Sequence, residues 1–160
     1  MVDGMNLGGE PARKKRIYVD ICALCRPFDD QSRVRICLET DAVRLILAHV
    51  RQGKYEFVVS PVHFAEISAT AYEEEKAQVL TFFDAFGRQP SWDLGKARKR
   101  AEGLCQSKFG PADAAHIAFA EQEAEVFITC DDMLLKKCRK TAIRIPAMGP
   151  VEFSISEGLK

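Results

Sequence analysis

Short runs of apolar residues alternate along this chain with longer stretches in which apolar side chains recur at helical spacing. Short runs rich in Ile, Val and Phe are typical of strands buried in a parallel sheet, whereas helical spacing is typical of helices that cover such a sheet. The alternation predicts an α/β protein with three layers (α/β/α), in which a central parallel sheet of about four to five strands is flanked by helices. We expect strands at residues 16–20, 56–60, 126–129 and 143–145, with a further short strand near 151–153. We expect helices at residues 31–52, 73–86, 96–109, 112–124 and 133–140, and one more that starts at 60–61.

The length of 160 residues and the lack of an internal repeat favour a single domain. We expect a flexible basic leader at residues 1–15, a single domain at 16–153 and a C-terminal tail at 154–160. The leader combines several glycines with the basic run Arg13–Arg16, a composition that favours a solvated tail over an RNA-binding arm.

Composition narrows the class of protein without naming a ligand. Lysine plus arginine number 23, as do aspartate plus glutamate, so the net charge does not itself indicate nucleic-acid binding. No apolar run approaches the roughly 18 residues of a membrane span, and residues 1–10 lack the order of a signal peptide. Six cysteines without a secretion signal indicate reduced thiols, so we expect a cytoplasmic protein that does not use a membrane.

Acidic residues stand where the expected strands end or the following helices begin. Asp20 ends the first strand, Glu66 lies in the helix after the second strand, Asp113 lies in the first turn of an alanine-rich helix, and Asp131 follows the third long strand. Because the carboxyl ends of parallel strands meet at one edge of a sheet, we expect these four side chains to converge there. Asp20 and Asp113 could instead cap a turn or a helix, which is a common role of aspartate.

Convergence of several carboxylates indicates a cation. Like charges in one cleft repel one another and raise each other's pKa values, which costs stability unless a positive charge is present. Mg²⁺ and Mn²⁺ prefer oxygen ligands and are often held by a few carboxylates together with substrate phosphate. The chemistry that fits such a site is metal-assisted hydrolysis of a phosphodiester.

Four segments carry these acids in a familiar order, and together they resemble the PIN domain, most closely the prokaryotic group that includes the VapC toxins of toxin–antitoxin pairs. The resemblance extends over residues 17 to 132 and rests on the segments Ile17–Asp20, Ser60–Glu66, Ala112–Ala118 and Ile128–Asp132.

The resemblance implies a role and partners. It implies that Asp20, Glu66, Asp113 and Asp131 are the catalytic, metal-binding acids of a ribonuclease that uses Mg²⁺ or Mn²⁺. It also implies an RNA substrate, an antitoxin protein as partner, and a homodimer. The alternative is a PIN-like protein that binds metal or RNA without cleaving it. A receiver domain or a haloacid-dehalogenase-type phosphatase fits less well, because the acidic residues that those folds need beside the first Asp are missing.

Three further residues are candidate accessories. His116 lies one helical turn after Asp113, where it could contact substrate phosphate, hold Asp113, or be a packed core histidine. Arg26 follows the first strand and could contact RNA. Asp132 could supplement Asp131, although we favour a helix cap.

The chain departs from the family pattern directly after Asp20. The family commonly has Ser, Thr or Asn there, whereas this chain has Ile21 and Cys22, which removes a usual polar helper and motivates the non-cleaving alternative. Cys22 and Cys25 form a C-x-x-C pair, but the surrounding sequence gives little support for a redox or zinc role. We expect His63 to be structural.

Two residue groups are candidates for partner contacts. The aromatic side chains of residues 82–86, with Trp92, belong either to the core or to an interface with an antitoxin or a second subunit. The candidates for RNA backbone contacts are Arg98, Lys99, Arg100, Lys108, Lys136, Lys137, Arg139 and Lys140.

Overall fold

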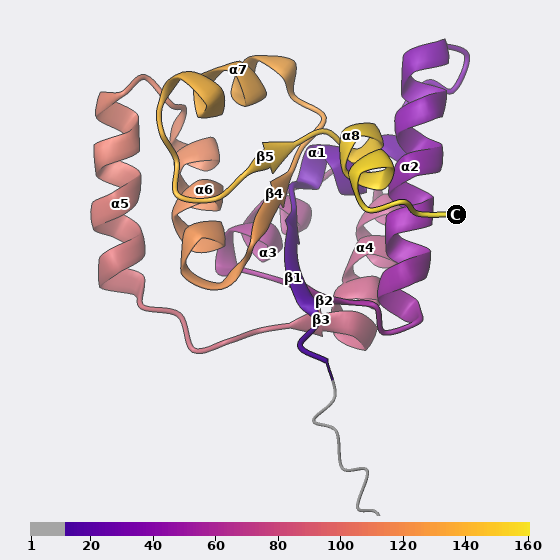
Figure 1. The fold of residues 1–160 in the computed structure, drawn as a ribbon, viewed down its shortest axis with the longest axis horizontal. Coiled ribbons are helices and arrows are strands. Elements are labelled where there is room, and N and C mark those ends of the chain that lie inside the picture. Colours follow the sequence, from indigo (N-terminus) through magenta and orange to yellow (C-terminus); the bar gives the residue numbers. More distant parts are fainter. Residues whose placement is uncertain (1–11) are drawn as a thin grey trace, which may run out of the picture.

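Five parallel strands form one sheet at the centre of the molecule (Figure 1). The computed structural model describes residues 12–160, so most of the expected leader at 1–15 lies outside the described residues. The strand order is β3-β2-β1-β4-β5, which places β1 in the middle. The strands are β1 (Lys15–Val19), β2 (Tyr55–Val58), β3 (Gly87–Arg88), β4 (Val126–Ile128) and β5 (Ala147–Met148).

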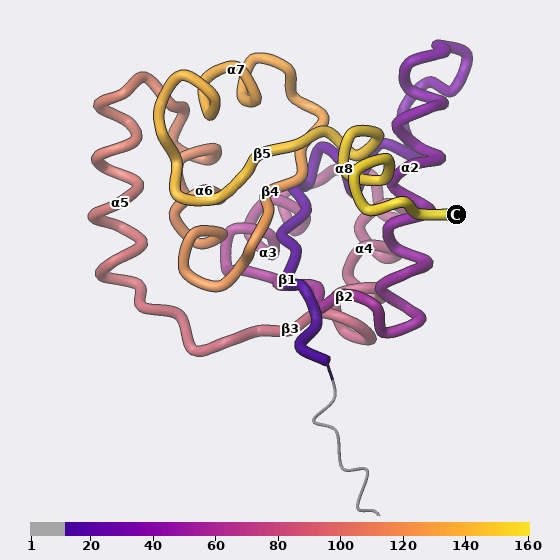
Figure 2. Tube along the Cα trace, viewed as in Figure 1, coloured from indigo at the N-terminus to yellow at the C-terminus, as the bar shows by residue number. Residues whose placement is uncertain are grey.

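Helices cover both faces of this sheet, as the tube in Figure 2 also shows. They are α1 (Ile21–Leu24), α2 (Val34–Arg51), α3 (Pro61–Ser68), α4 (Glu73–Phe86), α5 (Leu94–Gln106), α6 (Pro111–Glu123), α7 (Asp132–Lys140) and α8 (Pro150–Ser156), with a 3₁₀ turn at Arg26–Phe28. The three-layer α/β/α arrangement with a parallel sheet, predicted from the sequence, is confirmed. None of the helices in residues 12–160 combines the length and apolar character that crossing a bilayer would require.

The central strand supplies both halves of the core. Successive side chains of a strand point to opposite faces. Ile17 and Val19 therefore pack with α2, α4 and α8, whereas Tyr18 packs with α5, α6 and α7. All three side chains are buried. The alternation matters for function, because it aims the hydroxyl of Tyr18 at the α6 layer while the strand itself runs on to Asp20.

Two strand predictions near the C-terminus are wrong. Residues 143–145 are not a strand: Ile143 and Ile145 are partly buried against the α5–α6–α7 layer, and pairing with β4 starts only when Phe127 N–H bonds the carbonyl of Pro146. The strand expected near 151–153 is helix α8, because Pro150 occupies its first turn and Phe153 is its buried anchor. Sequence reasoning also missed α1 and β3.

One glycine is required by close packing where α4 meets β3. A Cβ added at Gly87 would lie 2.5 Å from the carbonyl oxygen of Phe83 and 2.7 Å from a methyl group of Val59. Only glycine allows the chain to leave α4 and join the sheet at this distance.

Candidate metal centre

The parallel register of β1 and β4 places the first site residue. Val19 pairs with Ile128, and the backbone N–H of Asp20 donates to the carbonyl oxygen of Ile128 at 2.8 Å. Asp20 therefore lies at the carboxyl edge of the sheet, beside Thr129 of the neighbouring strand's end. Its side chain makes no capping hydrogen bond to α1, so the capping role considered for it is not seen.

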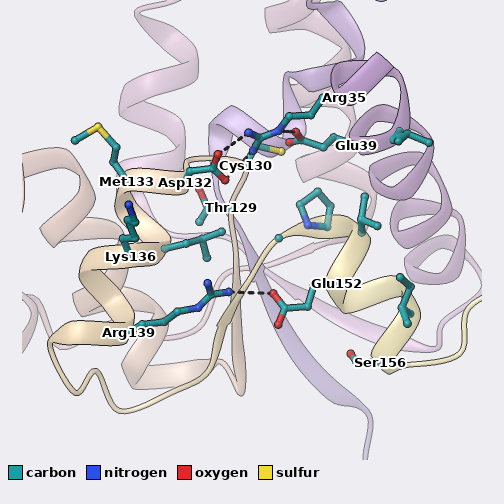
Figure 3. Close-up of a pocket in the computed structure, with 16 residues that line it drawn as sticks. Arg35, Glu39, Thr129, Cys130, Asp132, Met133, Lys136, Arg139, Glu152 and Ser156 are labelled. Atoms are coloured by element: carbon teal, nitrogen blue, oxygen red, sulfur yellow. Dashed lines mark hydrogen bonds and ion pairs between the residues drawn. The ribbon is translucent and has the colours of Figure 1, made fainter. Parts of the chain in front are cut away.

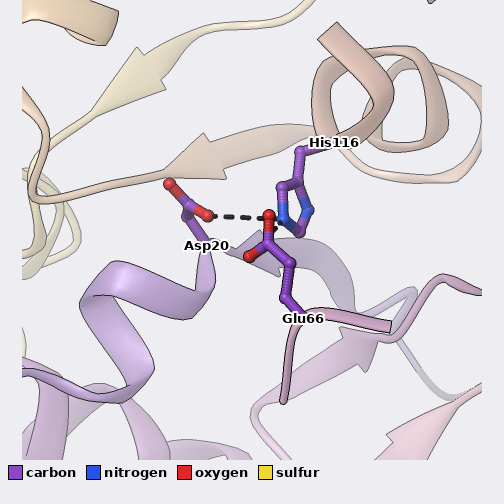
Figure 4. Close-up of side chains that lie close together, drawn as sticks. All are labelled: Asp20, Glu66 and His116. Carbon is purple, nitrogen blue, oxygen red and sulfur yellow. Dashed lines mark ion pairs between the residues drawn. The ribbon is translucent and has the colours of Figure 1, made fainter. Parts of the chain in front are cut away.

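The side chains of Glu66 and His116 meet that of Asp20 at the edge of the sheet (Figure 4). One ligand atom each of Asp20, Glu66 in α3 and His116 in α6 all lie within 4.8 Å of one another. Nε2 of His116 is 3.1 Å from Glu66 Oε2 and 3.6 Å from Asp20 Oδ1. The imidazole is 1% exposed, whereas the Glu66 side chain is 32% exposed. The cluster is therefore closed behind His116 and open to solvent at Glu66.

The Asp20 carboxylate is held by two donors on one oxygen. Thr129 Oγ1 donates to Asp20 Oδ2 at 2.8 Å, and the Cys22 thiol donates to the same oxygen at 3.2 Å. Oδ1 is left facing His116. The expectation that Ile21 and Cys22 remove a polar helper is therefore wrong for Cys22, because its thiol takes part in orienting Asp20.

A buried hydrogen-bonded chain holds His116 from behind. Its Nδ1 lies 2.6 Å from the hydroxyl of Tyr18, which lies 2.7 Å from Oγ of Ser60. The chain continues to His63, whose Nδ1 accepts from the backbone N–H of Ser60 and whose Nε2 donates to the carbonyl of Val19. Because the Ser60 N–H can only donate, the proton of the His63 ring is on Nε2. His63 is structural, as predicted. No signal in the sequence indicates that Tyr18 and Ser60 belong to the same hydrogen-bonded chain as His63 and His116.

Asp113 lies half-buried beside the cluster. The N-cap of α6 is Gly110, and no side-chain hydrogen bond caps this helix among residues 12–160. Asp113 lies in the first turn of α6, where the helix N-terminus favours a negative charge, so this alternative to a metal role stands. Burial raises the pKa of the Asp113 carboxyl, and the negative charges of Asp20 and Asp131 raise it further, while His116 opposes the rise. The charges of Asp20 and Asp131 therefore act on Asp113, but among the described residues Asp113 and Asp131 are not part of the group of ligand atoms within 4.8 Å of one another.

Asp131 and Asp132 have different surroundings. Asp131 caps α7, since its Oδ1 accepts from the N–H of Leu134 at 3.0 Å. Asp132 is exposed and accepts two hydrogen bonds from the guanidinium of Arg35. The cap that we assigned to Asp132 therefore belongs to Asp131, and Asp132 faces away from the cluster toward α2.

Arg26 does not join the cluster either. Its guanidinium pairs with Asp29 at 2.9 Å and with the buried Glu39 at 3.3 Å.

The C-x-x-C pair also lacks the properties of a redox site, because burial raises the pKa of both Cys22 and Cys25, whereas reactive thiols need a lowered pKa. All six cysteines are free thiols.

A separate groove of about 940 Å³ lies between α2, α7 and α8 (Figure 3). Its charged walls are largely self-paired, as in the contacts of Arg35 with Asp132 and of Arg139 with Glu152. Thr129 lines this groove, but Asp20, Glu66 and His116 do not. The candidate chemistry therefore lies at the sheet edge and not in this groove.

Comparisons with known proteins concern the fold. No family model and no curated protein matches the sequence. Five chains of solved structures match the structure, and one of them is described as the crystal structure of FitAcB from Neisseria gonorrhoeae. The two chains are 15% identical and superpose with a TM-score of 0.52 over 84% of this chain and 97% of that chain. At this identity the likeness supports a shared, PIN-like α/β/α fold.

Proposed function

We propose that the protein is a metal-dependent ribonuclease of the PIN/VapC type, which hydrolyses RNA phosphodiesters at the carboxyl edge of its sheet. The observation that carries the proposal is the meeting of Asp20, Glu66 and His116 within 4.8 Å, with a half-buried Asp113 beside them. The elements concerned are far apart in sequence, so the gathering of acids is a property of the fold.

The residues present fit a divalent metal ion. Among the described residues no hydrogen-bond donor is seen at Asp20 Oδ1, whereas Thr129 and Cys22 both donate to Oδ2. Burial chiefly, and then the negative charges of Asp20 and Asp131, raise the pKa of Asp113, and a cation would offset both effects. Asp20, Glu66 and Asp113 would hold Mg²⁺ or Mn²⁺, and Asp131 would contribute through the oxygen that does not cap α7.

The bound ion would lower the pKa of a water molecule, and its positive charge would stabilise the negative charge of the phosphate. The chain's own contribution is to hold the carboxylates in place and to leave one side open. Thr129 connects the two segments, since its Oγ1 donates to the Asp20 carboxylate and accepts from the backbone N–H of Asp131 at 3.2 Å. Glu66, on the open side, is where RNA would approach.

Basic side chains for the RNA backbone are fewer than the sequence indicated. Arg98 pairs with Glu102, and Arg100 pairs with the buried Glu121. Lys137 donates to a backbone carbonyl, that of Lys108. Arg139 pairs with Glu152. Among residues 12–160, ion pairs are not seen for the side chains of Lys99, Lys108, Lys136 and Lys140, which we propose as the phosphate contacts.

Partner contacts are also part of the proposal. In the region considered for an antitoxin or a second subunit, Phe82 and Phe83 are buried, and only Phe86 is exposed, at 39%. Trp92 packs edge-on against Phe119. Any antitoxin or homodimer contact in this region would therefore centre on Phe86, and the two buried aromatic side chains belong to the core.

The non-cleaving alternative remains a second candidate, but the observation that favoured it is weaker. It rested on the loss of a polar helper after Asp20, and the Cys22 thiol supplies a donor there.

The test compares the wild-type protein with Asp113→Asn, using fluorescent single-stranded RNA with Mn²⁺, Mg²⁺ or EDTA. Asp132→Asn is the matched control, because it removes the same charge from a residue that faces Arg35 and not the cluster. We expect metal-dependent cleavage by the wild type and by the control, and none by Asp113→Asn. A folded wild type that binds metal but cleaves no RNA in a broad pool would support the non-cleaving alternative.

A further inference from the structure

One nitrogen atom in the cluster is buried and has no hydrogen bond. Nε2 of His116 has no hydrogen-bond partner among the described residues, although the side chain is only 1% exposed. Glu66 Oε2 lies 3.1 Å away, but the contact lacks the direction that a ring N–H needs. Burying a polar atom without a hydrogen-bond partner costs folding free energy, so this nitrogen is a candidate to bind a ligand.

The hydrogen-bonded chain behind His116 is compatible with a lone pair on Nε2. In this arrangement His116 Nδ1–H donates to Tyr18, Tyr18 donates to Ser60, and the Ser60 hydroxyl donates to His63 Nδ1 at 3.3 Å. His63 then donates from Nε2 to the carbonyl of Val19. In this arrangement the Ser60 N–H and hydroxyl share Nδ1 of His63 as acceptor, and Nε2 of His116 keeps a lone pair at 3.1 Å from Glu66 Oε2 and 3.6 Å from Asp20 Oδ1. Such support of the remote ring nitrogen is typical of histidines that bind metals.

The two distances from His116 Nε2 to the carboxylates are close to the spacing of two ligands of one ion. Adjacent ligands of an octahedral ion with bonds of about 2.1 Å are about 3.0 Å apart, and those of a tetrahedral ion about 3.4 Å apart. Nε2 of His116 is 3.1 Å from Glu66 Oε2 and 3.6 Å from Asp20 Oδ1. Little movement is therefore needed for the imidazole to share an ion with these carboxylates.

We propose that His116 is a nitrogen ligand in this metal centre and that it makes the site hold borderline ions such as Co²⁺ and Zn²⁺ more tightly than Mg²⁺. The inference rests on the metal site of the proposed function but adds a ligand of a different chemical type. Imidazole suits late first-row ions, whereas Mg²⁺ prefers oxygen. The mixed ligand set therefore predicts a selectivity that carboxylates alone would not give.

The direct test is ¹⁵N nuclear magnetic resonance of the histidine side chains, with Zn²⁺ as the probe. The chain has only three histidines, of which His63 is committed at both nitrogens and His49 Nδ1 contacts the carbonyl of Leu45. We expect the Nε2 resonance of His116 to carry a lone pair in the metal-free protein and to shift when Zn²⁺ is added. An Nε2 that stays unchanged while Zn²⁺ binds would overturn the inference.

Calorimetry of His116→Gln tests the selectivity. The Kd for Zn²⁺ should rise about tenfold or more, whereas the Kd for Mg²⁺ should change less than about threefold. Ser60→Ala is the matched control, because it breaks the same buried chain without removing Nε2; it should keep the Zn²⁺ preference. Equal weakening of Zn²⁺ and Mg²⁺ in His116→Gln would contradict the proposed selectivity.

The outcomes separate this inference from the proposed function. If Asp113→Asn weakens metal binding but the His116 resonance does not respond to Zn²⁺, the carboxylate site stands and the nitrogen ligand fails. If the wild type binds neither Zn²⁺ nor Mg²⁺, both fail. The ¹⁵N measurement uses the wild-type protein, so the inference can be overturned even if His116→Gln does not fold.

Discussion

The hydroxyl of Tyr18 lies 2.6 Å from Nδ1 of His116, so strand β1 supports the imidazole from behind while its next-but-one residue, Asp20, faces the imidazole from the front. One strand thus contributes to two sides of the same cluster. The contact is buried, and the Tyr18 pKa is raised well above its ordinary value, chiefly by that burial. Tyr18 therefore stays neutral and can hold one tautomer of His116.

Replacing Tyr18 with phenylalanine should destabilise the fold and weaken metal binding at the proposed site. The change leaves Ser60 and His116 Nδ1 without their partner, which should lower the unfolding free energy by about 1–3 kcal/mol. It should also raise the Kd for Zn²⁺ roughly tenfold, because the His116 imidazole loses the hydroxyl that holds its Nδ1. Urea denaturation and calorimetry measure the two effects.

Tyr55→Phe is the control for that variant. It removes a hydroxyl that donates to Glu157 at 2.9 Å, at a point remote from the cluster. We expect some loss of stability but an unchanged Kd for Zn²⁺. An equal loss of metal affinity in both variants would argue that Tyr18 acts only through general stability.

Metal should stabilise the wild-type protein but not Asp113→Asn. Because Asp113 is crowded by other carboxylates, the variant should be at least as stable as the wild type in EDTA. Saturation of the wild type at about 100 times the Kd should add about 2.7 kcal/mol to the unfolding free energy. Thermal unfolding with Mn²⁺ or EDTA measures this, with Asp132→Asn expected to respond as the wild type does. A metal-induced rise of equal size in Asp113→Asn would exclude this carboxylate as a ligand.

The buried carboxylate of Glu39 should make stability depend on pH. Glu39 pairs with Arg26 and Arg35, and although burial tends to raise its pKa, these charges and the Cys130 thiol hold the pKa below the usual 4.5. For an acid with a lowered folded pKa, the contribution to stability is present above the unfolded value and is lost as the pH falls through the folded one.

Glu39→Gln should therefore lower the unfolding free energy by about 1–3 kcal/mol at pH 7, and the difference from the wild type should shrink as the pH falls below 4.5. Urea denaturation at several pH values measures the difference. Glu73→Gln is the control, because the Glu73 side chain is 85% exposed and should contribute little at any pH. A difference for Glu39→Gln that stays constant down to acid pH would contradict the assigned ionisation.

Two glycines should respond oppositely to alanine. Gly87→Ala places a Cβ 2.5 Å from a backbone oxygen of Phe83, so it should destabilise the protein by about 1–3 kcal/mol or more. Gly103 lies inside α5 with nothing within 4 Å of an added Cβ, so Gly103→Ala should stabilise it by about 0.4–1 kcal/mol. Chemical denaturation of both variants checks the pair, and a neutral Gly87→Ala would mean that α4 can shift away from β3.

Local signals in the sequence were enough to predict that acidic residues gather at one edge of the sheet. The run before Asp20 is apolar and β-branched, and a helix pattern follows each long strand, so the acids after the strands had to approach one edge of a parallel sheet. The same local reasoning failed at residues 143–145 and 151–153. There, short apolar runs fit a strand or a packed turn equally well, and only contacts with β4 and the α2 layer separate the two.

The sequence by itself determined the α/β/α class and the acids that follow the strands, because these depend on periodicity and on the order of elements. Only the tertiary structure decided how the cluster is completed. Ser60 and His116 lie 42 and 98 positions from Tyr18, and Thr129 lies 109 positions from Asp20. No local pattern links such residues, since their hydrogen bonds exist only after three helices and two strands have packed around one buried chain of polar groups.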